Sequence, residues 1–338
     1  MIVNGIPTRN LSDPTRARYF QNLEDGMKSP TFDQIVIPEI FDPVKILVDE
    51  KKVNRFAFTQ DDYDEWFLTS GSSSKRIGPA GLLANDLLQM FTTKYAPSQV
   101  VGLHTEEQLW FHHPVLVGEV VTLSAKYVDK YEKRGQGYVV MEAEARSERG
   151  KLLLSHRGVE IIRTAPAEVG GRGSTGGGSG RKVTSYFDEA LPGVSTLGHD
   201  ALVGMHLDAL EKETTMEQVA VFSRIGEFVS SIHTDLKTAH RNGMNLPIVQ
   251  GQQLVCYMTE LLTRAFGNQW FNGGTLHVKF LEPVKVFETL TIQAVIADIN
   301  IEDGRRFLDL DVWVKSRQGT LHAIGWARGW IPLKEVSI

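Results

Sequence analysis

A short polar segment in the second half of the chain carries the residues best suited to proton transfer. It reads Ile232-His-Thr-Asp235 and is followed by Lys237, His240 and Arg241. A histidine side chain has an ordinary pKa of about 6.5, so it can exchange protons at neutral pH. His233 is therefore the candidate acid or base. Either Glu227 or Asp235 could orient its ring or take part in the proton transfer. Asp235 could equally be the N-cap of a helix over residues 236–241.

Two glycines mark the starts of predicted helices, and the N-terminus at Gly251 could stabilise negative charge. Gly81 and Gly251 each follow a nearby proline and begin runs with apolar residues at helical spacing, over residues 81–91 and 251–262. The first N–H groups of a helix have no partner within it and lie at the positive end of its dipole. A glycine there lets a substrate oxygen approach the backbone. Gln250, directly before Gly251, could donate a hydrogen bond to a substrate but cannot titrate.

The elements that position these residues come from an internal duplication. At a fixed offset of 169, residues 114–162 align without a gap with residues 283–331, and twelve of the 49 pairs are identical. Apolar and polar residues alternate within the repeat, which is the period of a strand. Glycines separate the alternating runs as turn residues would; they are Gly135, Gly150, Gly304 and Gly319. The pattern predicts an α+β fold of two halves, each an antiparallel sheet round one apolar helix, with the two sheets joined edge to edge.

The halves differ in one place, and the candidate chemistry lies there. Upstream of the helices, the segments that begin at Thr59 and Thr214 align at an offset of 155. The second half must therefore contain about fourteen extra residues before its helix, the difference between the offsets 169 and 155. This insertion carries His233, which has no counterpart in the first half.

A glycine- and serine-rich tract over residues 170–180 separates the halves. Such a tract loses too much backbone entropy on ordering to lie inside a helix or strand. We therefore predict an N-terminal domain over residues 1–165, a linker over 166–185 and a C-terminal domain over 186–338.

Composition excludes several classes of protein. The net charge of −5 and the pI near 6.1 provide no extended basic surface for nucleic acid. The single cysteine, Cys256, cannot form an intrachain disulfide or a multi-cysteine metal site. No run of eighteen apolar residues and no signal-peptide pattern occurs in the sequence. These features favour a cytoplasmic protein without nucleic-acid or membrane partners.

One metal site fits the spacing of the polar segment. His233 and Asp235 have the separation of two ligands of an iron facial triad, and the third ligand would be a later histidine such as His277 or His322. A duplicated arrangement of sheet and helix neither requires nor explains an iron centre. We therefore expect no metal.

Several of these residues together resemble a known family. Ser231-Ile-His-Thr-Asp235, Ala239 and Pro247-Ile-Val-Gln-Gly251, within a duplicated helix-and-sheet unit, look like a double hot-dog protein of the MaoC-like (R)-specific enoyl-CoA hydratase type. The resemblance covers roughly residues 55–165 and 200–335. The chain departs from the family at three points: Ser230-Ser231 replaces Asn-Pro, the aspartate position holds Phe228 unless a one-residue insertion brings Glu227 there, and Gln250 replaces a histidine.

The resemblance implies an activity and a set of roles. The expected enzyme is a lyase of fatty acid metabolism that hydrates an enoyl-CoA thioester or dehydrates a 3-hydroxyacyl-CoA. Coenzyme A then enters only as part of the substrate, and cations such as Lys75-Arg76 or Lys133-Arg134 would meet its phosphates. The acyl chain of the substrate would be accommodated in the first half. The expected catalytic residues are His233, Glu227 and Gly251, and the expected substrate-binding residues are Gln250, Asp235 and Gly81.

Two other functions stay open at the level of sequence. A thioesterase on the same fold would aim water at the thioester carbonyl instead of the β-carbon. A protein that only binds acyl thioesters would account for the missing aspartate, Asn-Pro and second histidine. The sequence also leaves the oligomeric state open, with a homodimer as one option.

Overall fold

The computed structural model describes residues 24–68, 76–96, 99–100, 102–162, 182–223 and 231–333, together with the backbone of two short strands, β1 (Ile2–Val3) and β2 (Ile6–Pro7). The glycine-rich tract and Glu227 lie outside the described residues. The predicted domain boundaries therefore stay a prediction.

The first half is an antiparallel sheet folded over short helices. Its strand order is β3-β6-β7-β8-β5, and β4 also pairs with β6. The strands are β3 (Glu39–Ile40), β4 (Val44–Val48), β5 (Gly102–Phe111), β6 (Glu119–Lys133), β7 (Gln136–Ser147) and β8 (Leu152–Ile162). The helices are the 3₁₀ turn η1 (Phe32–Gln34), α2 (Glu50–Gln60), α3 (Glu65–Leu68), α4 (Leu82–Leu88) and the 3₁₀ turn η2 (Gln89–Thr93).

The second half repeats this plan round a longer helix. Its strand order continues as β12-β15-β14-β13-β10-β9, and β11 also pairs with β13. The strands are β9 (Gly193–Val194), β10 (His206–Leu207), β11 (Leu210–Glu213), β12 (Thr275–Phe280), β13 (Thr289–Glu302), β14 (Arg305–Ser316) and β15 (Leu321–Pro332). The helices are α5 (Met216–Ser223), α6 (Leu236–Arg241), α7 (Gly251–Phe266) and the 3₁₀ turn η4 (Gly267–Gln269).

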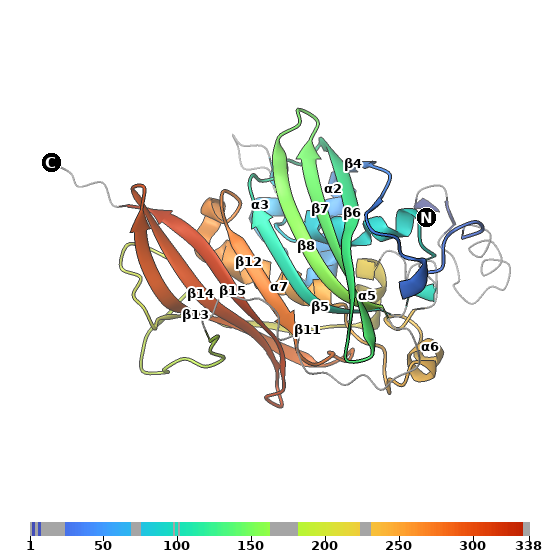
Figure 1. Cartoon of the computed structure of the whole chain (residues 1–338). Coiled ribbons are helices and arrows are strands. Elements are labelled where there is room, and N and C mark those ends of the chain that lie inside the picture. Colours follow the sequence, from blue (N-terminus) through green and yellow to red (C-terminus); the bar gives the residue numbers. More distant parts are fainter. Residues whose placement is uncertain are drawn as a thin grey trace.

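The two half-sheets join edge to edge through β5 and β12, as the duplication predicts. These strands pair antiparallel from Thr275 opposite Trp110 to Lys279 opposite Glu106. Figure 1 shows the two curved half-sheets side by side, with β5 and β12 between them. Among the named strands of the described sheet, β9 and β10 form a two-residue parallel pair at the outer edge.

Tight turns connect the long hairpins at the predicted glycines. Arg134 and Gly135 both have positive φ, 54° and 73°, and so do Asp303 and Gly304, at 48° and 71°. Two successive positive φ angles form the turn whose twist matches that of the strands on either side. The same turn therefore recurs at the same place in both halves.

The prediction of one long helix in each half is confirmed only for the second. Helix α7 spans sixteen residues from Gly251, whereas α4 spans seven and continues as the 3₁₀ turn η2. The hydroxyls of Thr92 and Thr93 donate to the carbonyls of Gln89 and Met90, each three residues back. These bonds accompany the tighter i to i+3 pattern at the end of the first-half helix.

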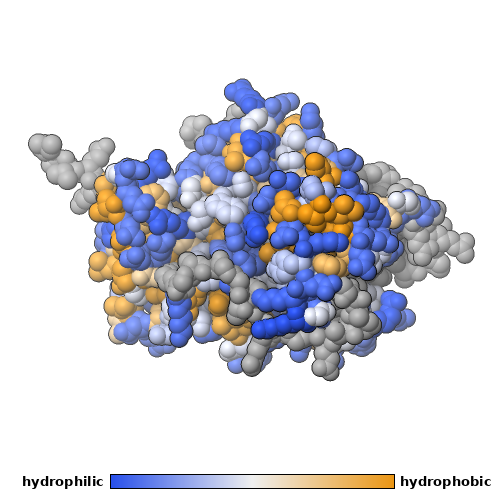
Figure 2. Space-filling view, in the orientation of Figure 1, coloured by the Kyte–Doolittle hydropathy of each residue, from blue (hydrophilic) through white to orange (hydrophobic). Residues whose placement is uncertain are grey.

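The face of the molecule seen in Figure 2 is mostly polar. Figure 2 shows hydrophilic residues over most of this face, with hydrophobic residues gathered in a few groups. Exposed large hydrophobic residues include Val36, Ile40 and Leu47. In the part of the chain that the structure describes, none of the helices combines the length and the apolar character needed to span a bilayer.

Helices α4 and α7 meet where Gly81 leaves room. A Cβ atom at Gly81 would lie 2.7 Å from Sγ, 3.0 Å from Cβ and 3.2 Å from Cα of Cys256. Both residues are buried, so the close approach of the two helices depends on the missing side chain.

We predict that Gly81→Ala lowers the free energy of unfolding by about 1–3 kcal/mol, the usual cost of overpacking a core. Cys256→Ala in the same chain should recover part of the loss, because it removes the atom nearest to the new methyl group. Denaturant titration measures both values. Gly102→Ala is the matched control, since a Cβ there meets its nearest atom at an ordinary 3.4 Å. Equal losses for the two glycine variants would contradict the prediction.

Candidate functional site

The N-terminus of α7 forms the centre of the candidate site. The segment before it is held to the sheet: Val249 N donates to Val284 O at 2.8 Å, and Val286 N donates to Pro247 O at 3.0 Å. Gln250 is the N-cap residue, with extended backbone and no side-chain hydrogen bond to the helix. Gln253 N donates to Gln250 O at 3.0 Å, and the two N–H groups before it have no partner within the helix. The Gln250 amide is not used for capping.

His233 is fixed beside this segment. Its ring Nδ1 lies 2.7 Å from Ile248 O, and Ile248 N donates to Ile232 O at 3.2 Å. A carbonyl oxygen can only accept, so Nδ1 carries the proton and Nε2 is left as the basic nitrogen. Burial lowers the pKa of His233 to about 4, because the surroundings disfavour a charged ring. At neutral pH this histidine is a base.

The inserted segment that carries His233 is built round a short helix. Asp235 is the N-cap of α6, and its carboxylate accepts from Thr238 N and Thr238 Oγ1, both at 2.7 Å. The structure therefore shows Asp235 as a helix N-cap, which was one of its two predicted roles. The expected contact of its carboxylate with the substrate stays a prediction. Glu227, the other expected partner of His233, lies outside the described residues.

Gly251 is enclosed by residues of both halves. A Cβ atom there would lie 3.1 Å from Cε1 of Phe280 and 3.2 Å from Cβ of His104. The rings of His104 and Phe280 pack together with centroids 4.7 Å apart. Because Phe280 lies on β12 and His104 on β5, the joint between the two half-sheets sits directly against the first residue of α7.

Behind Gly251 lies a buried cluster that the sequence did not reveal. Glu107 Oε2 lies 3.0 Å from His104 Nε2 and 2.9 Å from His156 Nε2. The side chains of Glu107 and His156 are fully buried and that of His104 is 7% exposed. Burial alone would raise the pKa of Glu107, but the two imidazoles hold it below its ordinary value. We refer to His104, Glu107 and His156 as the imidazole–carboxylate cluster.

A bulge in β5 creates this cluster. Residues three apart on a regular strand point to opposite faces of the sheet. The register of β5 against β8 shifts between His104 and Glu106, so Thr105 is an extra residue in the strand. The shift brings His104 and Glu107 to the same inner face. The only sequence signal was a polar interruption at His104, Glu107 and His156 in strands that otherwise present apolar residues to the core.

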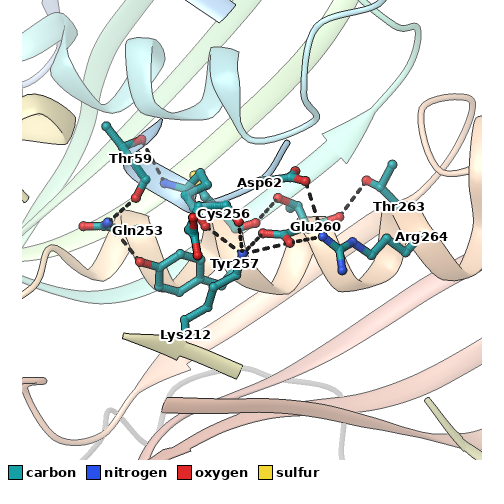
Figure 3. A network of polar contacts seen from close by, with 12 residues as sticks. Thr59, Asp62, Lys212, Gln253, Cys256, Tyr257, Glu260, Thr263 and Arg264 are labelled. Atoms are coloured by element: carbon teal, nitrogen blue, oxygen red, sulfur yellow. Dashed lines mark hydrogen bonds and ion pairs between the residues drawn. The ribbon is translucent and has the colours of Figure 1, made fainter. Parts of the chain in front are cut away.

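A second polar network surrounds the middle of α7. Lys212 Nζ donates to Gln60 O at 2.7 Å, to Asp61 O at 3.1 Å and to Glu260 Oε1 at 2.9 Å. Arg264 Nη2 lies 2.7 Å from Glu260 Oε1 and 3.4 Å from Asp62 Oδ1. Figure 3 shows Lys212 and Arg264 reaching the Glu260 carboxylate from two sides. Burial raises the pKa of Glu260 to about 7.

Four residues of this network line a pocket of about 200 Å³ that also includes Gly81; they are Gln60, Asp62, Glu260 and Arg264. The expected substrate-binding glycine is therefore placed at the α4–α7 contact and at the wall of this pocket, away from the described neighbours of His233. Because Lys212 and Arg264 already pair with the carboxylates, the network mainly ties α7 and β11 to the end of α2. The role of Gly81 in binding the substrate stays a prediction.

The expected cations and metal ligands are engaged elsewhere. Arg76 donates to Phe67 O and pairs with Glu50 at 2.7 Å, and Lys75 lies outside the described residues. His277 Nε2 lies 2.7 Å from Glu106 Oε1, and His322 Nδ1 lies 3.1 Å from Glu282 O. Within the described ranges, no group of three His, Cys, Asp or Glu side chains could hold a metal ion.

We predict that His233 keeps a neutral ring with Nδ1 protonated down to about pH 5, since its pKa lies near 4. Its pKa is lower in the folded than in the unfolded chain. Its contribution to stability is therefore complete above pH 6.5 and is lost as the pH falls from 6.5 towards 4. Long-range ¹H–¹⁵N NMR of the histidine rings follows both tautomer and titration, and the His233→Ala spectrum assigns the signals. A midpoint near 6.5 would contradict this environment.

We predict that Glu107→Gln lowers the free energy of unfolding by about 3–5 kcal/mol, because it leaves buried imidazoles without their charged partner. Burial would lower the pKa of His104, but Glu107 raises it above 6.5. The stabilisation from this pair is present below pH 6.5 and is lost as the pH rises through the raised value. The loss should therefore be larger at pH 6 than at pH 9 in denaturant titrations. Equal losses of unfolding free energy at the two pH values would contradict the ion-pair explanation.

Comparisons with known proteins agree with this architecture. Residues 36–155 match the family model described as the FAS1-like dehydratase domain region. A solved structure described as a MaoC-like dehydratase has a TM-score of 0.67 and 14% sequence identity, and the match covers 90% of this chain and 100% of that one. A comparison with curated proteins found no match.

Two further solved structures share the fold. A MaoC domain protein dehydratase from Chloroflexus aurantiacus matches with a TM-score of 0.66 and 11% identity, over 90% of this chain and 98% of that one. A conserved hypothetical protein from Mycobacterium tuberculosis, described as a double hot-dog fold, matches with a TM-score of 0.62 and 14% identity, over 90% and 98%. The chain is therefore a double hot-dog protein with the fold of the MaoC-like dehydratases, as the sequence resemblance predicts.

Proposed function

We propose that the protein hydrates an α,β-unsaturated acyl-CoA thioester, or dehydrates the corresponding 3-hydroxyacyl-CoA. The observation that carries the proposal is a neutral histidine base held on the segment that leads into an uncapped helix N-terminus. His233 is anchored on Ile248, and α7 begins three residues later at Gly251. The likeness to structures described as MaoC-like dehydratases supports the same reaction class.

The reaction needs a general base and hydrogen-bond donors, and this site contains candidates for both. A base must take a proton from water as the water oxygen adds to the β-carbon, and the unprotonated Nε2 of His233 suits that role. Donors must also stabilise the negative charge that develops on the thioester oxygen. The free N–H groups at the start of α7 suit the second role, and Gln250 beside them can add a side-chain donor.

Coenzyme A, a cytoplasmic location and a homodimer are further parts of this proposal. Lys133 and Arg134, in the turn between β6 and β7, are the remaining candidate cations for the phosphates among the described residues. The acyl chain would extend towards the first half, where α4 is short.

We predict that His233→Ala lowers kcat by about 10²–10⁴, the usual contribution of a general acid or base. Gly251→Ala should also lower turnover, because a methyl group would press on Phe280 and His104 and displace the first turn of α7. His240→Ala is the matched control: it removes an exposed histidine of the same inserted segment.

The assay follows loss of the conjugated-thioester absorbance with crotonyl-CoA and longer enoyl-CoA substrates, and free thiol is measured alongside. The variants are compared at matched melting temperature. Absorbance loss without thiol supports hydration. Thiol release by the wild type would make the protein a thioesterase, and unchanged turnover in His233→Ala would remove the histidine from the mechanism.

A further inference from the structure

The pocket beside α4 lies at the place in the first half that corresponds to the start of α7. Just before α4, Ile77 forms an antiparallel bridge with Leu116. Just before α7, Ile248 forms the same kind of bridge with Lys285, which follows Leu116 by 169 residues, the offset of the repeat. The pocket has a volume of about 200 Å³, and Gly81 forms part of its wall. The function proposed above uses the start of α7 and leaves this pocket unassigned.

Buried hydrogen-bond acceptors gather at this pocket. Asp62 and Glu260 both line it and are 4% and 6% exposed. Gln60 also lines it and is 1% exposed; its Nε2 donates to Thr59 Oγ1 at 3.3 Å, while its Oε1 has no hydrogen-bond partner among the described residues. The amide is neutral, so no ion pair replaces the missing bond. A buried acceptor without a donor is unfavourable, and these groups therefore favour a ligand that brings N–H groups.

A single nitrogen position reaches both carboxylates. Arg264 Nη2 lies 2.7 Å from Glu260 Oε1 and 3.4 Å from Asp62 Oδ1, and Figure 3 shows these contacts. The Arg264 side chain is 44% exposed, whereas both carboxylates are buried. An ion pair with so exposed a partner contributes little to stability, so the guanidinium can move into solvent at small cost. Its position marks where the charged group of a ligand can be held.

The electrostatic surroundings favour a positively charged ligand. Burial raises the pKa of Asp62 and of Glu260, and the charge of Asp62 raises the pKa of Glu260 further, to about 7. Lys212 pairs with Glu260 Oε2 at 2.8 Å, so displacement of Arg264 leaves the charge of Asp62 for the ligand. An anion would be repelled by these carboxylates. An acyl chain would leave the buried oxygens without donors.

The remaining walls fit a short apolar body. They include four residues of the first half, namely Phe56, Phe67, Pro79 and Ala80. A cavity of about 150 Å³ holds benzene, so this pocket has room for a ligand of about eight to ten non-hydrogen atoms. Within the described ranges no three His, Cys, Asp or Glu side chains are arranged to hold a metal ion, which favours an organic cation.

We propose that this pocket binds a small organic ammonium ion. Its charged nitrogen replaces the Arg264 guanidinium between Asp62 and Glu260, and its apolar body lies against Phe56 and Phe67. Arg264 acts as a built-in competitor that covers the carboxylates and turns into solvent when the ligand binds. The inference goes beyond the hydratase function and does not depend on it, because binding is measured without substrate.

Isothermal titration calorimetry with benzylamine tests the charge of the ligand. Benzyl alcohol and benzoate are the neutral and anionic comparisons, since they carry the same ring. The wild type should bind benzylamine at least about tenfold more tightly than either, because hydrogen bonds to charged groups are the stronger ones. Asp62→Asn should weaken benzylamine binding by about 10- to 100-fold. Asp61→Asn is the matched control: it removes the neighbouring exposed carboxylate at a φ of 49°, which asparagine tolerates, and should bind as the wild type does.

Arg264→Ala tests the displacement of the arginine. This variant should bind benzylamine about two- to fivefold more tightly than the wild type, because the competing ion pair is gone. It changes an exposed residue and so serves also if Asp62→Asn does not fold. Weaker binding in Arg264→Ala would overturn the displacement. The proposal as a whole would be overturned by tighter binding of benzoate than of benzylamine, by equal affinities in Asp62→Asn and Asp61→Asn, or by no benzylamine binding in the wild type and Arg264→Ala.

Discussion

The burial of α7 is the constraint on which the rest of the structure depends. All of its residues except Gly251 and Arg264 are buried, although the helix carries Gln252, Gln253, Thr259, Glu260 and Thr263. A helix enclosed in this way needs apolar cover on every side and internal partners for its polar groups. The two half-sheets supply the cover as one continuous sheet, so neither half could bury α7 in this way alone.

Some of the polar groups around α7 reach partners in the first half of the chain. Gln253 Nε2 donates to Thr59 O, and Lys212 joins Glu260 to the carbonyls at the end of α2. Each buried charge has an opposite charge within reach, which is how proteins lower the cost of moving ions out of water. These contacts make the joint between the halves specific as well as apolar.

The same joint gives the two halves unequal parts in the candidate site. The inserted segment brings His233 to the segment before α7, while β5 of the first half brings His104 to Gly251 on the other side. The first half has no counterpart of the inserted histidine, yet its sheet edge contacts the first residue of α7. A duplicated fold thus surrounds one asymmetric candidate site with residues from both copies.

Elements that depend on local pattern can be predicted from the sequence alone. The period-two runs, the glycine turns at 135 and 304, the start of α7 at Gly251 and the N-cap at Asp235 all follow from residues close together in the chain. The duplication can be predicted in the same way, since identical residues at a fixed offset need no structure to be seen. His233 could be singled out because it sits where the two copies differ.

Which distant residues contact each other depends on the tertiary structure. The bulge at Thr105, which turns His104 and Glu107 to one face, leaves no mark in a single sequence, because its geometry is set by pairing with β8. The helix predicted over residues 81–91 is longer than α4, because the apolar pattern continues through residues that adopt 3₁₀ geometry. The environment of His233 is likewise a property of packing: burial lowers its pKa, the hydrogen bond with the Ile248 carbonyl opposes that shift, and neither effect can be read from residue types.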